Sequence, residues 1–164
     1  MASRDVKDLT PKMQELYQKF AQEMARAGHP FIVTSTARTM KEQAALYAQG
    51  RQGLKEVNAL RKICLMTPIT ESDNGHCVTW TMKSEHLIDL DDTNPDNDKS
   101  RAFDIALVDV KNPKAVFWNP KVDVDADGVP DYVEAGKIGE SVGLVWGGRW
   151  KNADYPHFQQ NPKL

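Results

Sequence analysis

The sequence is poor in cysteine and has no long apolar run. Its 164 residues include two cysteines, Cys64 and Cys77, in no CxxC or zinc-knuckle arrangement, which excludes a disulfide scaffold. We expect two reduced structural thiols; one disulfide in an oxidising compartment is the alternative. No stretch approaches the roughly 20 apolar residues of a membrane span, and charges stand where a signal peptide has its apolar core. We therefore expect a product made in the cytoplasm, with no membrane anchor.

An excess of charge of one sign is also missing. The chain has 21 Lys and Arg against 23 Asp and Glu, a formal net charge of −2. Nucleic acids and anionic membranes attract strongly basic surfaces, so this balance disfavours both as partners. With 40% apolar residues and no repeat or low-complexity linker, the chain is expected to form a single domain, residues 1–164, with a sizeable core. A monomer is the default expectation.

Local patterns predict helices in the first half and mainly strands in the second. Residues 11–27 have Thr10 as N-cap, Pro11 at the first helical position, an apolar stripe and Gly28 as stop. Further helices are expected at 39–50, 54–66 and around 132–143, and strands at 31–38, 77–84, 101–110 and near 155–159. Helices followed by a meander of strands indicate an α+β domain with a mostly antiparallel sheet.

Residues 123–134, DVDADGVPDYVE, follow the pattern of an EF-hand calcium loop. The expected ligands are Asp123, Asp125, Asp127, the Val129 carbonyl, Asp131 and Glu134, with Gly128 making the sharp turn. Pro130 has no N–H to pair with a sister loop, so the sequence predicts a solitary calcium loop that stabilises a turn. The aspartate-rich residues 87–100 lack such spacing. They are interpreted as a solvated surface insertion, with a weak calcium site as the alternative.

Calcium does not account for a second set of polar residues. His86 follows a predicted strand directly, His157 lies near the C-terminus, and Asp104 interrupts the apolar stretch AFDIAL. An unpaired buried carboxylate is very costly, so Asp104 needs a partner. A zinc ion held by two imidazoles and one carboxylate would provide one and would leave a coordination position open for water. Arg101 is an alternative partner, and the other two histidines are interpreted as ordinary surface or core residues.

Five separated blocks resemble the family of zinc D-alanyl-D-alanine carboxypeptidases and L-alanyl-D-glutamate endopeptidases, which includes VanY-like enzymes and many phage endolysins. In chain order these blocks are VTSTARTMKEQAALYAQGR, SEH, SRAFDIAL, GLVWGGRW and DYPHF, and they run from about residue 31 to residue 160. The resemblance implies a zinc metallopeptidase that hydrolyses peptidoglycan stem peptides with zinc-activated water.

The resemblance also implies residue roles. His86, Asp104 and His157 correspond to the zinc ligands, Asp154 to the general base, Arg38 to an oxyanion or carboxylate clamp, and Gln43 and Ser84 to positions near the substrate. The family usually places the aspartate seven residues after the first histidine, where this chain has Thr93. Residues 87–100 would therefore be an insertion between two strand ends.

Trp146 and Trp150 are expected to form a wall of the cleft, with core packing as the alternative. Gly147 and Gly148, which stand between them, would let the substrate backbone come near.

Within this family an L-alanyl-D-glutamate endopeptidase is favoured, because a VanY-like enzyme more often carries an export signal or membrane anchor. The chain resembles the endolysins of phages that infect Gram-negative hosts, which are made in the host cytoplasm and act on the wall at lysis. Bound calcium is expected to stabilise or activate the enzyme. The alternatives are a D-alanyl-D-alanine carboxypeptidase and a non-catalytic metal-binding module, against which the presence of Asp154 argues.

Overall fold

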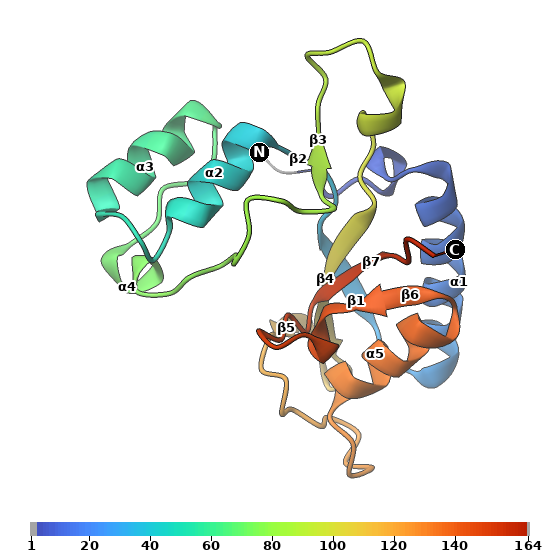
Figure 1. Ribbon diagram of the computed structural model, residues 1–164. Helices are drawn as coiled ribbons and strands as arrows, with labels where there is room; N and C mark the ends of the chain where they lie inside the picture. Colours follow the sequence, from blue (N-terminus) through green and yellow to red (C-terminus); the bar gives the residue numbers. More distant parts are fainter. Residues whose placement is uncertain (1–2, 164) are drawn as a thin grey trace.

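The computed structural model describes residues 3–163 and has an α+β fold built on an antiparallel sheet (Figure 1). Its strands are β1 (Phe31–Ser35), β4 (Ala102–Asp109), β5 (Asn112–Phe117), β6 (Leu144–Trp146) and β7 (His157–Gln160). The central strand β4 pairs with β1 along one edge. Along its other edge β4 pairs first with β7 and then with β5, and β6 pairs with β7. The predicted class and sheet type are therefore confirmed.

Two helices cover one face of this sheet (Figure 1): α1 (Pro11–Ala27) and α5 (Asp131–Ser141). Helix α1 begins as predicted, with the Thr10 side chain accepting from the Met13 N–H, and ends at Gly28 with a φ of 81°. Its Phe20 ring packs between the rings of Phe103 and Phe158, with centroids 5.6 and 4.8 Å away. This aromatic cluster forms the centre of the core and supports the two strands that carry Asp104 and His157.

A smaller group of helices stands beside the sheet (Figure 1) and comprises α2 (Met40–Ala48), α3 (Leu54–Ile63) and α4 (Glu71–Asn74). The predicted capping box of α2 is present, since Thr39 and Glu42 each bond to the other's backbone N–H. A parallel pair, β2 (Arg38–Thr39) and β3 (Leu87–Ile88), links this group to the sheet. The described residues also form three short 3-10 helices: η1 (Val6–Asp8), η2 (Pro95–Asn97) and η3 (Gly147–Arg149).

The strand predicted at residues 77–84 is wrong. This segment has no regular secondary structure, and its backbone carbonyls are bound by side chains: Gln43 donates to the carbonyl of Thr81 and Arg51 to that of Thr79. The alternation that indicated a strand reflects apolar side chains that remain exposed, among them Val78 and Trp80. The strand expected at 31–38 is also divided, because β1 ends at Ser35 and β2 begins at Arg38.

The acid-rich stretch 87–100 begins with β3, passes through η2 and is mostly exposed. Several of its turns are closed by its own side chains, as where Asp89 accepts from the Asp91 N–H. Cys64 and Cys77, both within residues 3–163, are not joined in a disulfide. No helix in that range is both long enough and apolar enough to cross a membrane.

Candidate active site

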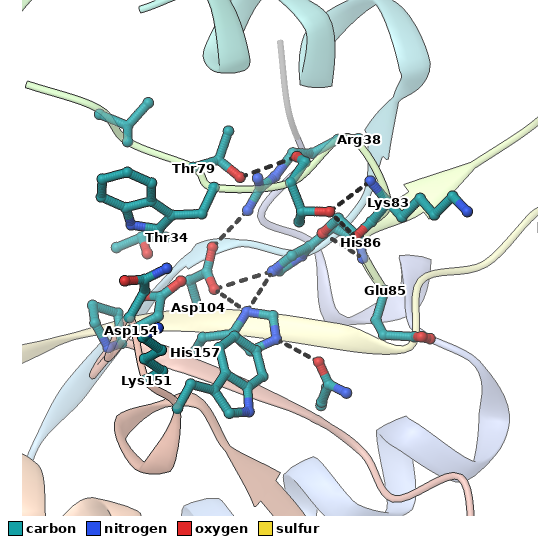
Figure 2. A pocket seen from close by; sticks show the side chains of 18 of the residues that line it. Thr34, Arg38, Thr79, Lys83, Glu85, His86, Asp104, Lys151, Asp154 and His157 are labelled. Atoms are coloured by element: carbon teal, nitrogen blue, oxygen red, sulfur yellow. Dashed lines mark hydrogen bonds and ion pairs between the residues drawn. The ribbon is translucent and has the colours of Figure 1, made fainter. Parts of the chain in front are cut away.

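Three side chains that are distant in the sequence meet beside the β4–β7 pair of the main sheet. The Oδ1 atom of Asp104 lies 3.0 Å from His86 Nε2 and 3.0 Å from His157 Nδ1, and the two nitrogens are 3.2 Å apart (Figure 2). The register of β4 and β7 places Asp104 directly opposite His157, and His86 immediately precedes β3. The structure thus brings together the three residues that the sequence resemblance marked as ligands.

Outer hydrogen bonds determine which nitrogen of each imidazole carries a lone pair. His86 Nδ1 bonds to the carbonyl of Thr36, which can only accept, so Nε2 is the unprotonated nitrogen. His157 Nε2 lies 3.0 Å from Oε1 of Gln159, another acceptor, so Nδ1 is unprotonated. Three atoms with lone pairs therefore face one another within 3.2 Å. Such an arrangement requires a shared proton or metal ion.

The geometry fits a zinc ion. Tetrahedral zinc–nitrogen bonds of about 2.05 Å place neighbouring ligand atoms roughly 3.3 Å apart, close to the 3.0 and 3.2 Å separations of this site. Two neutral imidazoles and one carboxylate are a donor set that zinc accepts, and they leave a coordination position for water. The outer bonds to Thr36 and Gln159 resemble those that orient metal-binding histidines.

The protonation states of His86 and Asp104 also suit a metal centre, whereas the hydrogen bond to Asp104 raises the pKa of His157. Burial lowers the pKa of His86, which favours the neutral imidazole. Burial alone would raise the pKa of Asp104, but the imidazoles of His86 and His157 hold it well below its usual range. A neutral histidine and an ionised aspartate are the forms that bind metal. These two residues therefore need no deprotonation near neutral pH.

Arg38 contacts the other oxygen of the same carboxylate. Its Nη2 lies 2.8 Å from Asp104 Oδ2 (Figure 2). Nη1 is 3.1 Å from Gln43 Oε1, and Nε is 3.2 Å from Ser35 Oγ. The guanidinium lines the pocket but is almost completely buried. Its first role is therefore to orient the carboxylate of Asp104.

The structure places Gln43 behind the pocket wall and not on it. Its side chain is fully buried and is absent from the pocket lining within residues 3–163. Its amide oxygen accepts from Arg38, and its nitrogen donates to Thr79 Oγ1 and to the Thr81 carbonyl at 3.1 and 2.7 Å. The expected contact of Gln43 with substrate is thus replaced by a link between Arg38 and residues 77–84, most of which line the pocket and which are called the wall segment.

Asp154 and Ser84 both line the pocket. The Asp154 backbone is held by Gly147 and His157, because its N–H donates to the Gly147 carbonyl and its own carbonyl accepts from the His157 N–H. Burial raises the pKa of the Asp154 carboxyl, and the charge of Asp104 raises it further. Within residues 3–163 no side chain or backbone group hydrogen-bonds to this carboxyl. Ser84 Oγ accepts from the His86 N–H at 3.3 Å and so shapes the turn before that histidine.

Comparison with known proteins finds similarity to peptidases. A family model described as D-alanyl-D-alanine carboxypeptidase matches residues 98–160, a range that includes Asp104, Asp154 and His157. Peptidoglycan L-alanyl-D-glutamate endopeptidase CwlK of Bacillus subtilis (strain 168) is 26% identical over 156 residues, which are 94% of this chain and 75% of CwlK. These similarities support a peptidoglycan peptidase of this family. The matched range leaves out His86 and Arg38, whose placement in the centre rests on the geometry.

A solved structure has a similar fold. The crystal structure of the L-Ala D-Glu endopeptidase ChiX from Serratia marcescens aligns with a TM-score of 0.54 at 15% identity, over 99% of this chain and 90% of that one. At this identity the likeness concerns the fold alone.

The pocket of the peptidase has a volume of about 790 Å³ and contains Asp154 and an unexpected set of tryptophans. It also contains His86, Asp104 and His157, which we call the metal-facing residues. Trp150 lines it, with its ring centroid 5.0 Å from that of His157. Trp80 and Trp118 line it as well. Sequence reasoning missed both, because Trp80 was placed in a strand that does not exist and Trp118 follows β5, which was not predicted.

Trp146 is in the core, so its expected place on the cleft wall is wrong. It is 3% exposed, and its Nε1 donates to the Tyr155 carbonyl at 2.9 Å. A Cβ built on Gly148 would lie 2.2 Å from this indole, and one on Gly147 would lie 2.5 Å from the Asp154 carbonyl oxygen. The two glycines therefore make room for Trp146 and for the turn of Asp154, and not for substrate.

The acidic loop of the peptidase places its ligands in two groups. Asp123, Asp125 and Asp127 lie together, whereas Asp131 and Glu134, at the start of α5, lie with His29. Glu134 Oε2 is 3.2 Å from His29 Nε2. Asp123 closes the turn by accepting from the N–H groups of Ala126 and Gly128. The expected convergence of all the ligands on one point is therefore only partly present, and His29 is a neighbour that the loop pattern did not indicate.

Proposed function

We propose that this peptidase hydrolyses the L-alanyl-D-glutamate bond of peptidoglycan stem peptides as a zinc enzyme. The observation that carries the proposal is the facing set of His86 Nε2, Asp104 Oδ1 and His157 Nδ1 in an open pocket that also contains Asp154. The choice of bond is supported by the likeness to CwlK, an L-alanyl-D-glutamate endopeptidase, along 94% of this chain. Cleavage of D-alanyl-D-alanine is the second candidate, because it is the activity in the description of the matching family model.

A zinc ion held by His86, Asp104 and His157 would act as a Lewis acid that lowers the pKa of water and polarises the scissile carbonyl. Asp154 is the base that accepts the proton from the attacking water and returns it to the leaving amine. Two features of the site suit it to this role. Burial raises the pKa of its carboxyl, and no group in the described chain hydrogen-bonds to that carboxyl, so it can receive a proton from the pocket.

Arg38 orients the metal ligand and offers positive charge to the pocket. Its ion pair with Asp104 Oδ2 directs Oδ1 toward the two imidazoles. Gln43 holds the guanidinium in place from behind. The same guanidinium lines the pocket, where its donors suit the oxyanion or a carboxylate of the substrate.

We also propose that residues 123–134 bind calcium and that calcium stabilises or activates the enzyme. The ligand spacing and the group formed by Asp123, Asp125 and Asp127 support this. Burial raises the pKa of Asp131 and of Glu134, and nearby carboxylates raise both further, so a bound cation would relieve their repulsion. Helix α5 contacts β6, which pairs with the His157 strand β7. An ordered loop would thereby support the metal centre.

The biological setting proposed is that of a phage endolysin, made in the host cytoplasm and acting on the wall at lysis as a monomer. The support is the resemblance of five sequence blocks to such enzymes. Expression in a Gram-negative host whose inner membrane is then permeabilised tests it. Cell lysis is expected with the wild type and not with Asp154→Asn.

The decisive test of the activity is digestion of purified Gram-negative peptidoglycan by the zinc-loaded protein, followed by mass spectrometry of the soluble products. Peptides that begin with D-glutamate support the proposed bond. Loss of only a terminal D-alanine would support the second candidate, cleavage of D-alanyl-D-alanine. A wild type that releases nothing from any wall preparation would favour a non-catalytic metal-binding module.

A further inference from the structure

The tryptophans of this protein differ in how far they are exposed. The chain has four; Trp146 is buried in the core, and Trp80, Trp118 and Trp150 are 61%, 52% and 40% exposed. All three exposed tryptophans line the pocket that contains the metal-facing residues. Large apolar rings exposed together at a cleft are typical of a ligand-binding surface. Trp150 contacts the His157 ring, which leaves Trp80 and Trp118 without a role in the chemistry described above.

Trp80 is held in position although most of its ring is exposed. The guanidinium of Arg51 lies 5.6 Å from the Trp80 ring centroid and 3.9 Å from that of Tyr47. The same guanidinium donates to the Thr79 carbonyl at 3.1 Å. From the interior, Gln43 holds the carbonyl of Thr81. The wall segment on both sides of Trp80 is therefore fixed before any ligand binds, which lowers the entropic cost of binding.

Trp118 is also attached to a rigid element. It follows Phe117, the last residue of β5, whose ring packs edge-on against Tyr132 with centroids 6.1 Å apart. The Tyr132 hydroxyl donates to the Phe117 carbonyl at 3.1 Å. The buried Tyr132 side chain thus anchors the backbone directly before Trp118.

The chemistry of the proposed substrate indicates what these rings contact. In peptidoglycan the amino group of L-alanine is acylated by the lactyl group of N-acetylmuramic acid, and the scissile carbonyl belongs to that same alanine. One residue spans about 3.5 Å, so the sugar ring begins within one or two such lengths of the reacting carbonyl. A pocket of about 790 Å³ around the metal-facing residues must then receive part of the sugar together with the peptide. The C–H face of a pyranose is apolar and flat enough to pack against an indole.

We propose that Trp80 and Trp118 form a subsite for the N-acetylmuramic acid ring that carries the stem peptide, so that the enzyme prefers glycan-attached peptides to free ones. This inference rests on the proposed cleavage of the L-alanyl-D-glutamate bond. The D-alanyl-D-alanine bond lies three residues further from the sugar, roughly 10 Å more of extended chain. A sugar subsite next to the metal would serve the first bond and not the second.

The test compares two synthetic substrates of the zinc-loaded enzyme. One is N-acetylmuramyl-L-Ala-D-Glu-diaminopimelate, and the other is the same tripeptide with an N-acetyl cap, which removes the sugar without adding a charge. We expect wild-type kcat/KM to be about tenfold higher for the sugar-bearing substrate, a difference equivalent to ~1.4 kcal/mol. Trp80→Ala and Trp118→Ala should each reduce this preference severalfold while the capped tripeptide is cleaved at its former rate. Trp80→Phe should keep part of the preference, because it retains an aromatic face.

A matched control is Val116→Ala, which removes an exposed apolar side chain from β5 at a position outside the pocket lining; it should leave the preference unchanged. Equal wild-type cleavage of both substrates would overturn the subsite while leaving the proposed bond intact. A preference that survives both alanine variants would place the sugar elsewhere and overturn the assignment to these tryptophans. Failure to cleave either substrate would instead contradict the proposed function, and the subsite proposal would then fall as well.

Discussion

Arg38 and the metal-facing residue Asp104 form an ion pair that uses one nitrogen of the guanidinium and one oxygen of the carboxylate. Arg38 Nη2 lies 2.8 Å from Asp104 Oδ2, and Asp104 Oδ1 is left to face His86 and His157 (Figure 2). The carboxylate is thus oriented by an arginine on one side and presents a single oxygen to the centre on the other. A partner that orients a ligand in this way typically contributes 10- to 100-fold to metal affinity.

Arg38→Ala should therefore weaken zinc binding by about 10- to 100-fold. Competition with a chromophoric chelator measures the affinity directly. Arg26→Ala is the matched control, since Arg26 pairs with Glu23 on the exposed surface of α1. Unchanged zinc affinity in Arg38→Ala would show that the ion pair does not orient the ligand. Arg38→Lys should recover little, because an ammonium cannot reproduce the fork of donors that reaches Asp104, Gln43 and Ser35 together.

Gln43→Ala should destabilise the protein by about 1–3 kcal/mol, because it leaves the buried Nη1 donor of Arg38 without its partner and removes one bond to the Thr81 carbonyl. Urea denaturation of the zinc-loaded protein measures the free energy of unfolding. Gln18→Ala, on the exposed face of α1, should change it by less than about 0.5 kcal/mol. If Gln43 instead contacted substrate, the variant would retain its stability and show only a raised KM.

Asp154→Asn should lower kcat by about 100- to 10,000-fold, the usual contribution of a general base, while zinc affinity stays close to that of the wild type. Amide for carboxylate is nearly isosteric, so the turn held by Gly147 should persist. Zinc content and peptide release are measured on the same preparation. Loss of bound zinc together with activity would mean that Asp154 supports the metal site and does not act as the base.

Gly136→Ala should cost about 1–3 kcal/mol of stability through overpacking. A Cβ at this position of α5 would lie 2.3 Å from the Trp146 ring, which is enclosed by the core and cannot move away easily. Thermal unfolding monitors the effect. Lys137→Ala, one residue along and exposed, is the control and should be close to neutral. A Gly136→Ala protein as stable as the control would show that the indole can shift.

Calcium removal should lower the melting temperature and the activity of the zinc-loaded enzyme, and added calcium should restore both. A calcium-selective chelator applied at constant zinc content makes the measurement. Glu134→Gln is expected to raise the calcium concentration needed for half-maximal restoration, since it removes the charge of a proposed ligand that here pairs with His29. An identical melting temperature and activity with and without calcium would mean that the loop is only a structural turn.

Much of the local structure could be predicted because it depends on residues that are close in the chain. The Thr10 cap, the Gly28 stop and the Thr39–Glu42 capping box each involve hydrogen bonds across a few residues. The α+β class follows from the same short-range patterns. The motifs that resemble the peptidase family marked His86, Asp104 and His157, which the fold then brings together.

The placement of single side chains depended on contacts across the fold. Trp146 and Trp150 are four positions apart in one motif, yet the glycines beside Trp146 admit its ring into the core while Trp150 remains in the pocket. Gln43 turns inward because Arg38 and the wall segment offer it buried partners. Residues 77–84 became a pocket wall because side chains, and not a neighbouring strand, bind their carbonyls.

The sequence by itself determined which residues could cap, turn and bind a metal, since these properties belong to the side chain and its nearest neighbours. Only the tertiary structure decided which of them meet. His86 and His157 are 71 positions apart and come within 3.2 Å because the pairing of β4 with β7, and of β2 with β3, sets their positions. Strand register is a long-range property of the packed sheet, and no short window of sequence contains it.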